Sequence, residues 1–138
     1  MRISNYDSRR PRILVVEDDE DLRLFIKTVL VRAGFDVSLA ANGLEAIDRE
    51  DPDFDVILLD LAMPQMDGFS FLAQRRGKLR EIPVIVLTAR HQSQDVKRAI
   101  ELGAVDFLAK PFDNQMLLKR LQRAMKPIPR TGSSTVSW

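Results

Sequence analysis

The chain has 138 residues, enough for one domain with a single core and too few for two ordinary domains. It is 45% hydrophobic and 30% charged, and its 21 basic and 20 acidic residues nearly cancel, so composition gives no reason to expect non-specific binding to nucleic acid. The absence of cysteine excludes disulfides, thiolate metal sites and thiol nucleophiles. No apolar run approaches the roughly 18 residues of a membrane span, so we expect a soluble, cytoplasmic protein.

The chain is expected to begin with a loose tail, a strand and a helix. Residues 1–10 are polar and basic and are expected to form a flexible tail before the domain, which we place at residues 11–126. Residues 13–16 are apolar and predict a strand, and the acidic residues 17–20 follow it directly. A helix that stops near Gly34 should come next, because apolar residues recur there at the spacing of one helical face: Leu22, Phe25, Ile26, Val29 and Leu30.

The middle of the chain repeats this alternation. Residues 35–40 predict a short strand, and Asn42 is expected to cap a short helix that Asp51-Pro52 terminates. Residues 56–59 form an unbroken apolar run that ends at an aspartate, which is typical of a strand buried on both faces in a parallel sheet. A third helix is expected over residues 68–76.

The last part of the domain continues in the same way, with a strand over residues 83–88, a helix over 93–102, a strand over 104–109 and a helix over 113–125. In the helix over 93–102, we expect Val96, Ala99 and Ile100 to face inward. Residues 127–138 are expected to form a flexible tail or a truncated linker.

Five strands that alternate with five helices at these loop lengths predict an α/β protein with a flavodoxin-like (βα)5 fold, which is a doubly wound parallel five-stranded sheet. Right-handed crossovers favour the strand order 2-1-3-4-5, whose switch point lies between the first and third strands. In that order Glu17, Asp18 and Asp60 should converge at the carboxyl edge of the sheet.

Three carboxylates at one edge repel one another, and a bound cation removes the problem. All-oxygen ligands and the absence of cysteine point to Mg2+ or Mn2+ rather than zinc. Lys110 ends the last predicted strand and brings a positive charge able to pair with a carboxylate or a phosphoryl oxygen. A metal ion, a lysine and an aspartate are the parts of a phosphoryl-transfer site, in which Asp60 can itself be the nucleophile.

Each of these residues also has a simpler interpretation when it is taken alone. Residues 17–20 are compatible with an acidic run that solvates a loop, and Asp60 with a helix N-cap or a loop aspartate. Lys110 alone is compatible with an ordinary surface lysine. Their combination favours the phosphoryl-transfer site.

Four short motifs follow one another along the chain: Ile13-Leu14-Val15-Val16-Glu17-Asp18-Asp19, Leu59-Asp60-Leu61-Ala62-Met63-Pro64-Gln65-Met66-Asp67-Gly68, Val86-Leu87-Thr88-Ala89 and Lys110-Pro111-Phe112. In this order and spacing they resemble the receiver domain of bacterial two-component response regulators. The resemblance covers about residues 11–126. Each motif alone is weak, whereas four in register are highly specific.

The resemblance implies a phosphoacceptor and a metal site. Asp60 matches the aspartate that accepts the phosphoryl group. Glu17 and Asp18 match the acidic pair that holds Mg2+, together with Asp60 and the backbone carbonyl of Ala62.

The resemblance also implies a phosphate-binding and switch region. Thr88 and Ala89 match its switch hydroxyl and the residue after it, and Phe107 matches the aromatic side chain that moves inward with the threonine. Lys110 matches the lysine that contacts the phosphoryl group, and the Lys110-Pro111 peptide bond is expected to be cis. Taken alone, Phe107 is compatible with an ordinary core residue and Thr88 with an ordinary strand residue.

As a receiver, the chain would take a phosphoryl group onto Asp60 from a sensor histidine kinase or a histidine phosphotransfer protein, in a Mg2+-dependent reaction. The signal would pass to the face formed by residues 93–102, 104–109 and 113–125, where an effector domain or a target protein could bind. The resemblance implies a signalling domain rather than an enzyme, a monomer or a phosphorylation-dependent dimer, and no direct binding of nucleic acid or membrane.

Two rival functions share parts of this pattern. A phosphatase similar to haloacid dehalogenases also uses an aspartyl nucleophile with Mg2+, but it requires a second acid two residues later, where this chain has Ala62. A flavodoxin-like cofactor binder requires a phosphate-cradling loop after the first strand, where the acidic residues 17–20 would repel a phosphate.

Overall fold

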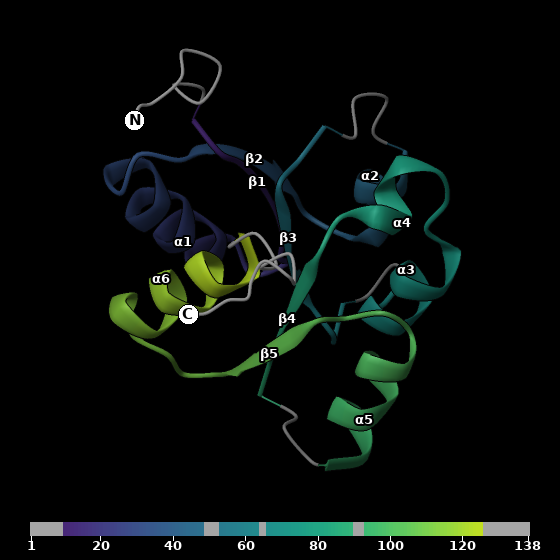
Figure 1. Cartoon of the computed structure of the whole chain (residues 1–138). Helices are drawn as coiled ribbons and strands as arrows, with labels where there is room; N and C mark the ends of the chain where they lie inside the picture. Colours follow the sequence, from purple (N-terminus) through teal and green to yellow (C-terminus); the bar gives the residue numbers. More distant parts are fainter. Residues whose placement is uncertain (1–9, 49–52, 64–65, 90–92, 126–138) are drawn as a thin grey trace, which may run out of the picture.

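A central sheet of five parallel strands lies between two layers of helices (Figure 1). The computed structural model describes residues 10–48, 53–63, 66–89 and 93–125. The strand order is β2-β1-β3-β4-β5, which confirms the predicted doubly wound topology. The strands are β1 (Arg12–Val16), β2 (Asp36–Ala40), β3 (Val56–Asp60), β4 (Val84–Thr88) and β5 (Asp106–Ala109).

The helices cover both faces of this sheet. Helices α1 and α6 pack on one face, and α2, α3, α4 and α5 pack on the other (Figure 1). In chain order the helices are α1 (Glu20–Arg32), α2 (Gly43–Ile47), α3 (Gly68–Gln74), α4 (Lys78–Glu81), α5 (Ser93–Glu101) and α6 (Asn114–Met125).

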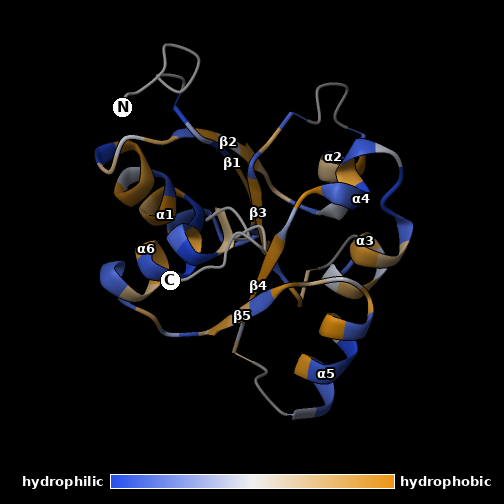
Figure 2. Ribbon diagram, viewed as in Figure 1, coloured by the Kyte–Doolittle hydropathy of each residue, from blue (hydrophilic) through white to orange (hydrophobic). Residues whose placement is uncertain are grey.

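The core has two halves, one on each face of the sheet. Successive side chains of a strand point to opposite faces, so Leu14 and Val16 pack in the half under α2 to α5, whereas Ile13 and Val15 pack under α1 and α6. All residues of β3 and β4 are buried. Figure 2 shows the strands as mostly hydrophobic and the helices as mixed. The continuous apolar runs in the sequence therefore have the predicted cause, which is burial on both faces.

The register of the strands brings their carboxyl ends to one edge. Val16 pairs with Leu59, Asp60 with Leu87, and Thr88 with Ala109. The residues at or just after these ends are therefore neighbours across the sheet, although they are far apart in sequence.

The segment between α3 and β4 differs from the prediction. Helix α3 ends at Gln74, two residues before the predicted end, and the short helix α4 was not predicted. Gly77 separates the two helices and has a φ of 58°, a backbone conformation that favours glycine. Only Leu79 is buried in α4, so four residues with one apolar anchor gave no periodic signal.

Two apolar side chains that were expected to face the core are exposed instead. Phe25 in α1 is 43% exposed and Ile100 in α5 is 44% exposed. Each neighbours a residue that is fully buried, Ile26 and Ala99 respectively. Consecutive residues differ in direction by about 100° around a helix, so the buried stripe includes one member of each pair and leaves the other in solvent.

Some expected features fall outside the described residues. The terminal segments predicted at residues 1–10 and 127–138 do so, apart from Arg10, and so does the predicted helix stop at residues 51–52. Within the described part of the chain, the helices are all too short or too polar to cross a membrane.

Candidate phosphorylation site

Three carboxylates meet at the carboxyl edge of the sheet. Glu17 and Asp18 follow β1, and Asp60 is the last residue of β3. One carboxylate oxygen from each lies within 4.8 Å of the others. Glu17 and Asp60 are buried and Asp18 is exposed, so the cluster meets solvent on the Asp18 side.

Hydrogen bonds to both the backbone and the side chain hold Glu17 in place. Its N–H donates to the carbonyl of Ala40 at 3.1 Å, and its own carbonyl accepts from Nη1 of Arg23 at 2.7 Å. Its Oε2 accepts from the N–H of Asp19 at 3.1 Å. Asp19 in turn caps α1 by accepting from the N–H of Leu22 at 3.1 Å. The start of α1 therefore holds Glu17 at the sheet edge.

Asp60 is held by the loop that follows it. The N–H of Ala62 donates to its Oδ1 at 3.2 Å, and the N–H of Leu61 donates to the carbonyl of Leu87 at 3.2 Å. Gly68, the first residue of α3, donates its N–H to the carbonyl of Leu61 at 2.9 Å. A Cβ at Gly68 would lie 2.7 Å from the carbonyl oxygen of Asp60, so only glycine lets α3 begin this close.

Lys110 brings the positive charge of the cluster. Its Nζ lies 3.1 Å from Oε1 of Glu17 and 3.5 Å from Oδ1 of Asp60. Its N–H donates to the carbonyl of Thr88 at 3.0 Å, which fixes the start of the side chain at the end of β4. The Lys110-Pro111 peptide bond is cis, in agreement with the expectation. One ammonium group is thus shared by two carboxylates in a cluster of three.

This imbalance of charge is visible in the acidity of Asp60. The pKa of Asp60 is raised from 3.8 to about 7, chiefly by burial, and the negative charge of Glu17 and a hydrogen bond with Asp18 contribute in the same direction. The ammonium of Lys110 and the N–H of Ala62 oppose the rise without cancelling it. The cluster therefore lacks positive charge.

The arrangement fits a hard divalent cation. The clustered donors are carboxylate oxygens, which Mg2+ and Mn2+ prefer, and a cation would offset both the burial and the repulsion from Glu17 that raise the pKa of Asp60. Glu17, Asp18 and Asp60 are the residues that could hold it. Ala62 is exposed two residues after Asp60.

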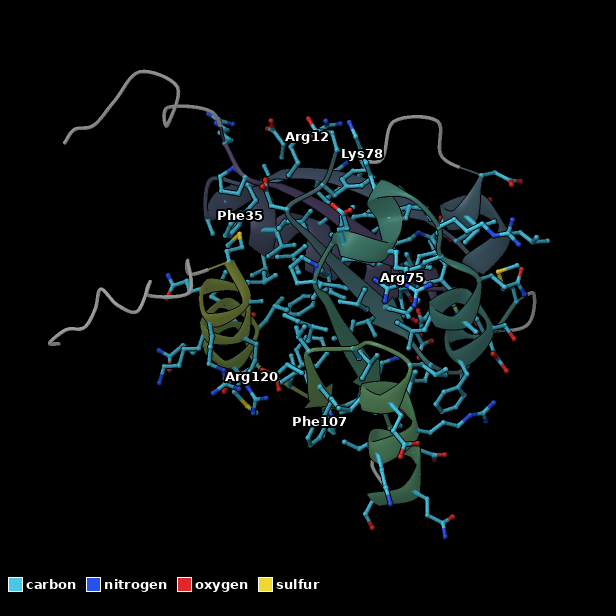
Figure 3. All side chains as sticks on the ribbon, turned by 45° about the vertical axis from the view of Figure 1, so that its right-hand side comes forward. Arg12, Phe35, Arg75, Lys78, Phe107 and Arg120 are labelled. Atoms are coloured by element: carbon cyan, nitrogen blue, oxygen red, sulfur yellow. The ribbon has the colours of Figure 1, made fainter. Side chains whose placement is uncertain are left out.

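The predicted switch residues lie beside the cluster. Thr88 is buried at the end of β4, and Ala89 after it is exposed. Val86 pairs with Phe107 and Thr88 pairs with Ala109, so Thr88 and Phe107 are on the same face of the sheet. Phe107 is half-buried on β5 and packs against the core under α2 to α5 (Figure 3).

Sequence reasoning missed two residues that support the site. Arg23 gave no signal because it contacts a backbone carbonyl, for which no residue pattern is needed. Gly68 was identified as the start of a helix, but its close approach to the backbone of Asp60 depends on the folded structure.

Comparison with known proteins places the chain in a family. Residues 13–122 match the family described as the response regulator receiver domain. A transcriptional regulatory protein of Haemophilus influenzae, a homolog of CpxR, is 38% identical over 115 residues, which are 83% of this chain and 50% of the relative. The chain spans about half the length of the curated relatives it matches.

Solved structures agree with this match. The chemotaxis protein CheY4 of Vibrio cholerae is 34% identical, with a TM-score of 0.80 over 84% of this chain and 99% of that one. The receiver domain of a sensor histidine kinase from Pseudomonas aeruginosa, which holds a magnesium ion coordinated in its active site cleft, is 32% identical, with a TM-score of 0.75 over 86% of this chain and 100% of that one. These matches do not favour the alternative of an aspartyl-nucleophile phosphatase.

Proposed function

Because the chain belongs to the family of response regulator receiver domains, we propose that it accepts a phosphoryl group on the carboxylate of Asp60. The observation that carries this proposal is the meeting of buried Asp60 with Glu17, Asp18 and Lys110 at one edge of the sheet. Glu17 also contacts Lys110, and what distinguishes Asp60 is its place at the end of the buried strand β3, where it matches the phosphoacceptor of the family.

We assign a Mg2+ or Mn2+ site to Glu17, Asp18 and Asp60, with the backbone carbonyl of Ala62 as a further ligand. The oxygen donors and the raised pKa of Asp60 support this assignment, and so does the magnesium ion in the related Pseudomonas receiver. When bound, the cation supplies neutralisation of charge on the phosphoryl oxygens.

The transfer itself needs a nucleophile and an electropositive partner from the chain. An ionised oxygen of Asp60 attacks the phosphorus of a phosphohistidine, the new O–P bond forms as the N–P bond breaks, and the imidazole leaves with the electron pair of the broken bond. Lys110 stands 3.5 Å from Oδ1 of Asp60, where its ammonium can pair with a phosphoryl oxygen.

The response to phosphorylation is assigned to Thr88, Ala89 and Phe107. The buried hydroxyl of Thr88 would donate to a phosphoryl oxygen, and Phe107, half-buried on the same face of the sheet, would pack further inward. A phosphoryl group adds a charge of about −2 and three acceptor oxygens. These would favour the inward arrangement of Thr88 and Phe107 over the arrangement without phosphate.

The partners follow from this chemistry. The donor would be a sensor histidine kinase or a histidine phosphotransfer protein. The output surface would be α5, β5 and α6. Exposed apolar side chains on these elements or directly before β5 support contact with an effector domain, a target protein or a second copy: Ile100, Val105 and Met116. In this role the domain signals, and its catalysis is limited to its own phosphorylation and dephosphorylation.

The proposal is tested by labelling with a small phosphodonor. Wild-type protein and Asp60→Asn are incubated with acetyl phosphate and Mg2+, and intact mass is measured with time. We expect one phosphoryl group per wild-type chain and none on Asp60→Asn. Asp53→Asn is the matched control, because it removes an equal charge at the opposite edge of the sheet, where Asp53 pairs with Arg12. Stoichiometric labelling of Asp60→Asn would show that the acceptor lies elsewhere.

A further inference from the structure

A buried arginine lies outside the phosphorylation site. Four polar or charged side chains are buried among the described residues, and three of them, Glu17, Asp60 and Thr88, belong to that site. The fourth is Arg75, which follows α3 and is 4% exposed. Figure 3 shows it close to the ribbon of α4, on the side of the sheet covered by α2 to α5.

The hydrogen bonds of Arg75 leave part of its guanidinium without a partner. Nη1 donates to the carbonyls of Leu79 at 3.2 Å and Ile82 at 3.1 Å, at the end of α4. Nε is buried and has no acceptor. Across the described ranges, no carboxylate forms an ion pair with Arg75. A buried charge without a counter-charge is costly, so binding of a negative group here would be favourable.

The electrostatic surroundings add to this deficit. Burial lowers the pKa of Arg75, and the positive charge of Arg80 lowers it further. The two arginines therefore repel each other where they line a common cavity. An anion between them would relieve both the burial cost and this repulsion.

A cavity of about 330 Å³ opens beside the guanidinium. Its wall includes Arg75, Arg80, Glu101 and Gly103. A Cβ on Gly103 would lie 2.7 Å from Nη2 of Arg75, so the lack of a side chain there leaves room for the guanidinium. This volume is at the small end of the range typical of pockets that hold small molecules.

We propose that this space, the Arg75 cavity, binds a small oxyanion that carries a phosphate or a carboxylate group. Nη1 is held by two carbonyls, which fixes the plane of the guanidinium and directs the Nε and Nη2 edge away from them. Nε is buried, so an anion in the cavity would accept first from Nη2, which lies beside Gly103 in the cavity wall. Exposed Arg80 supplies a second positive charge, and exposed Glu101 supplies the one opposing charge among the lining residues.

The proposal is tested by NMR titration of the metal-free wild-type protein. Inorganic phosphate and malonate are added separately at constant ionic strength, with chloride as the reference. We expect saturable shifts of the Gly103 amide and of the Arg75 Nε–H signal with one or both anions. Saturation by phosphate alone or by malonate alone identifies the preferred group. Amide signals near Asp60 report the phosphorylation site separately, so failure of one proposal does not imply failure of the other.

Two charge variants with opposite expectations, a matched control and the loss of Arg75 itself make the test specific. Arg80→Gln should weaken binding by roughly two- to fivefold, which is the range for one partly exposed charge, and Glu101→Gln should strengthen it by a similar factor. Arg76→Gln is the matched control, because Arg76 is exposed in the same segment and does not line the cavity. Arg75→Leu should abolish saturation, and if it fails to fold the other variants still decide. Shifts that stay linear, or saturable shifts that Arg80→Gln and Glu101→Gln leave unchanged, would overturn the proposal.

Discussion

The charge of Asp60 is costly in the folded protein. It is 4% exposed and shares its surroundings with Glu17, so its ionised form is disfavoured until positive charge is supplied. Lys110 supplies some of that charge, but it is divided between Glu17 and Asp60. The same crowding of negative charge would favour the binding of a divalent cation by the metal-free protein.

The cost of ionising Asp60 should appear in the pH dependence of stability. The pKa of Asp60 is 3.8 when unfolded and about 7 when folded, so between these values the folded state binds the extra proton and its stability falls as pH rises. In Asp60→Asn this loss should be absent, which leaves the variant more stable than wild type at pH 8 by on the order of 1–4 kcal/mol. Urea unfolding over a pH series with a chelator measures the difference. Parallel profiles for the two proteins would contradict it.

The metal assignment makes a separate prediction for Asp18. Asp18→Asn removes the exposed carboxylate of the cluster and should weaken Mg2+ binding by roughly 10- to 100-fold. Calorimetric titration with Mg2+ measures this affinity, and Asp53→Asn again serves as the control of equal charge. Unchanged affinity in Asp18→Asn would remove this residue from the metal site.

At the scale of elements, the site depends on where helices begin. Helix α1 starts directly after Asp19, and the N–H of Asp19 donates to the side chain of Glu17. Helix α3 starts at Gly68, whose N–H donates to the carbonyl of Leu61, the residue after Asp60. The two acidic strand ends are therefore positioned by the first turns of the helices that follow them. This is how a parallel sheet with short connections builds a site at its carboxyl edge.

Gly68 tests this dependence. In Gly68→Ala the new Cβ would lie 2.7 Å from the carbonyl oxygen of Asp60 and from Cα of Leu61, so the start of α3 must shift. We expect a loss of about 1–3 kcal/mol in the free energy of unfolding and slower labelling by acetyl phosphate. Ser70→Ala in the same turn should change neither strongly. Normal stability and labelling of Gly68→Ala would show that this contact does not position Asp60.

Elements differed in how well the sequence predicted them. The buried strands were predicted because burial on both faces requires an uninterrupted run of apolar residues, which β3 and β4 contain. Helix α4 was missed, since it has a single buried residue. The prediction of Ile100 as a core residue was wrong. Helical spacing shows how wide an apolar stripe is, but it does not show which side of the stripe packs against the sheet.

At the scale of the whole molecule, the topology explains why the meeting of Glu17, Asp18 and Asp60 could be predicted from the sequence. Once the strand order places β1 beside β3, the acids at their ends must be neighbours, and no distance needs to be known. The pKa of Asp60 and the uncompensated burial of Arg75 were beyond the sequence, because both depend on what surrounds a side chain in space.

The most direct test of the central proposal is to locate the phosphoryl group on the wild-type chain. Protein phosphorylated with acetyl phosphate is reduced with borohydride, which converts an acyl phosphate to a stable alcohol, and the modified residue is identified by peptide mass spectrometry. We expect the modification at Asp60 alone, and only when Mg2+ was present during phosphorylation. Modification at Asp18, Glu17 or any other residue in place of Asp60 would contradict the account.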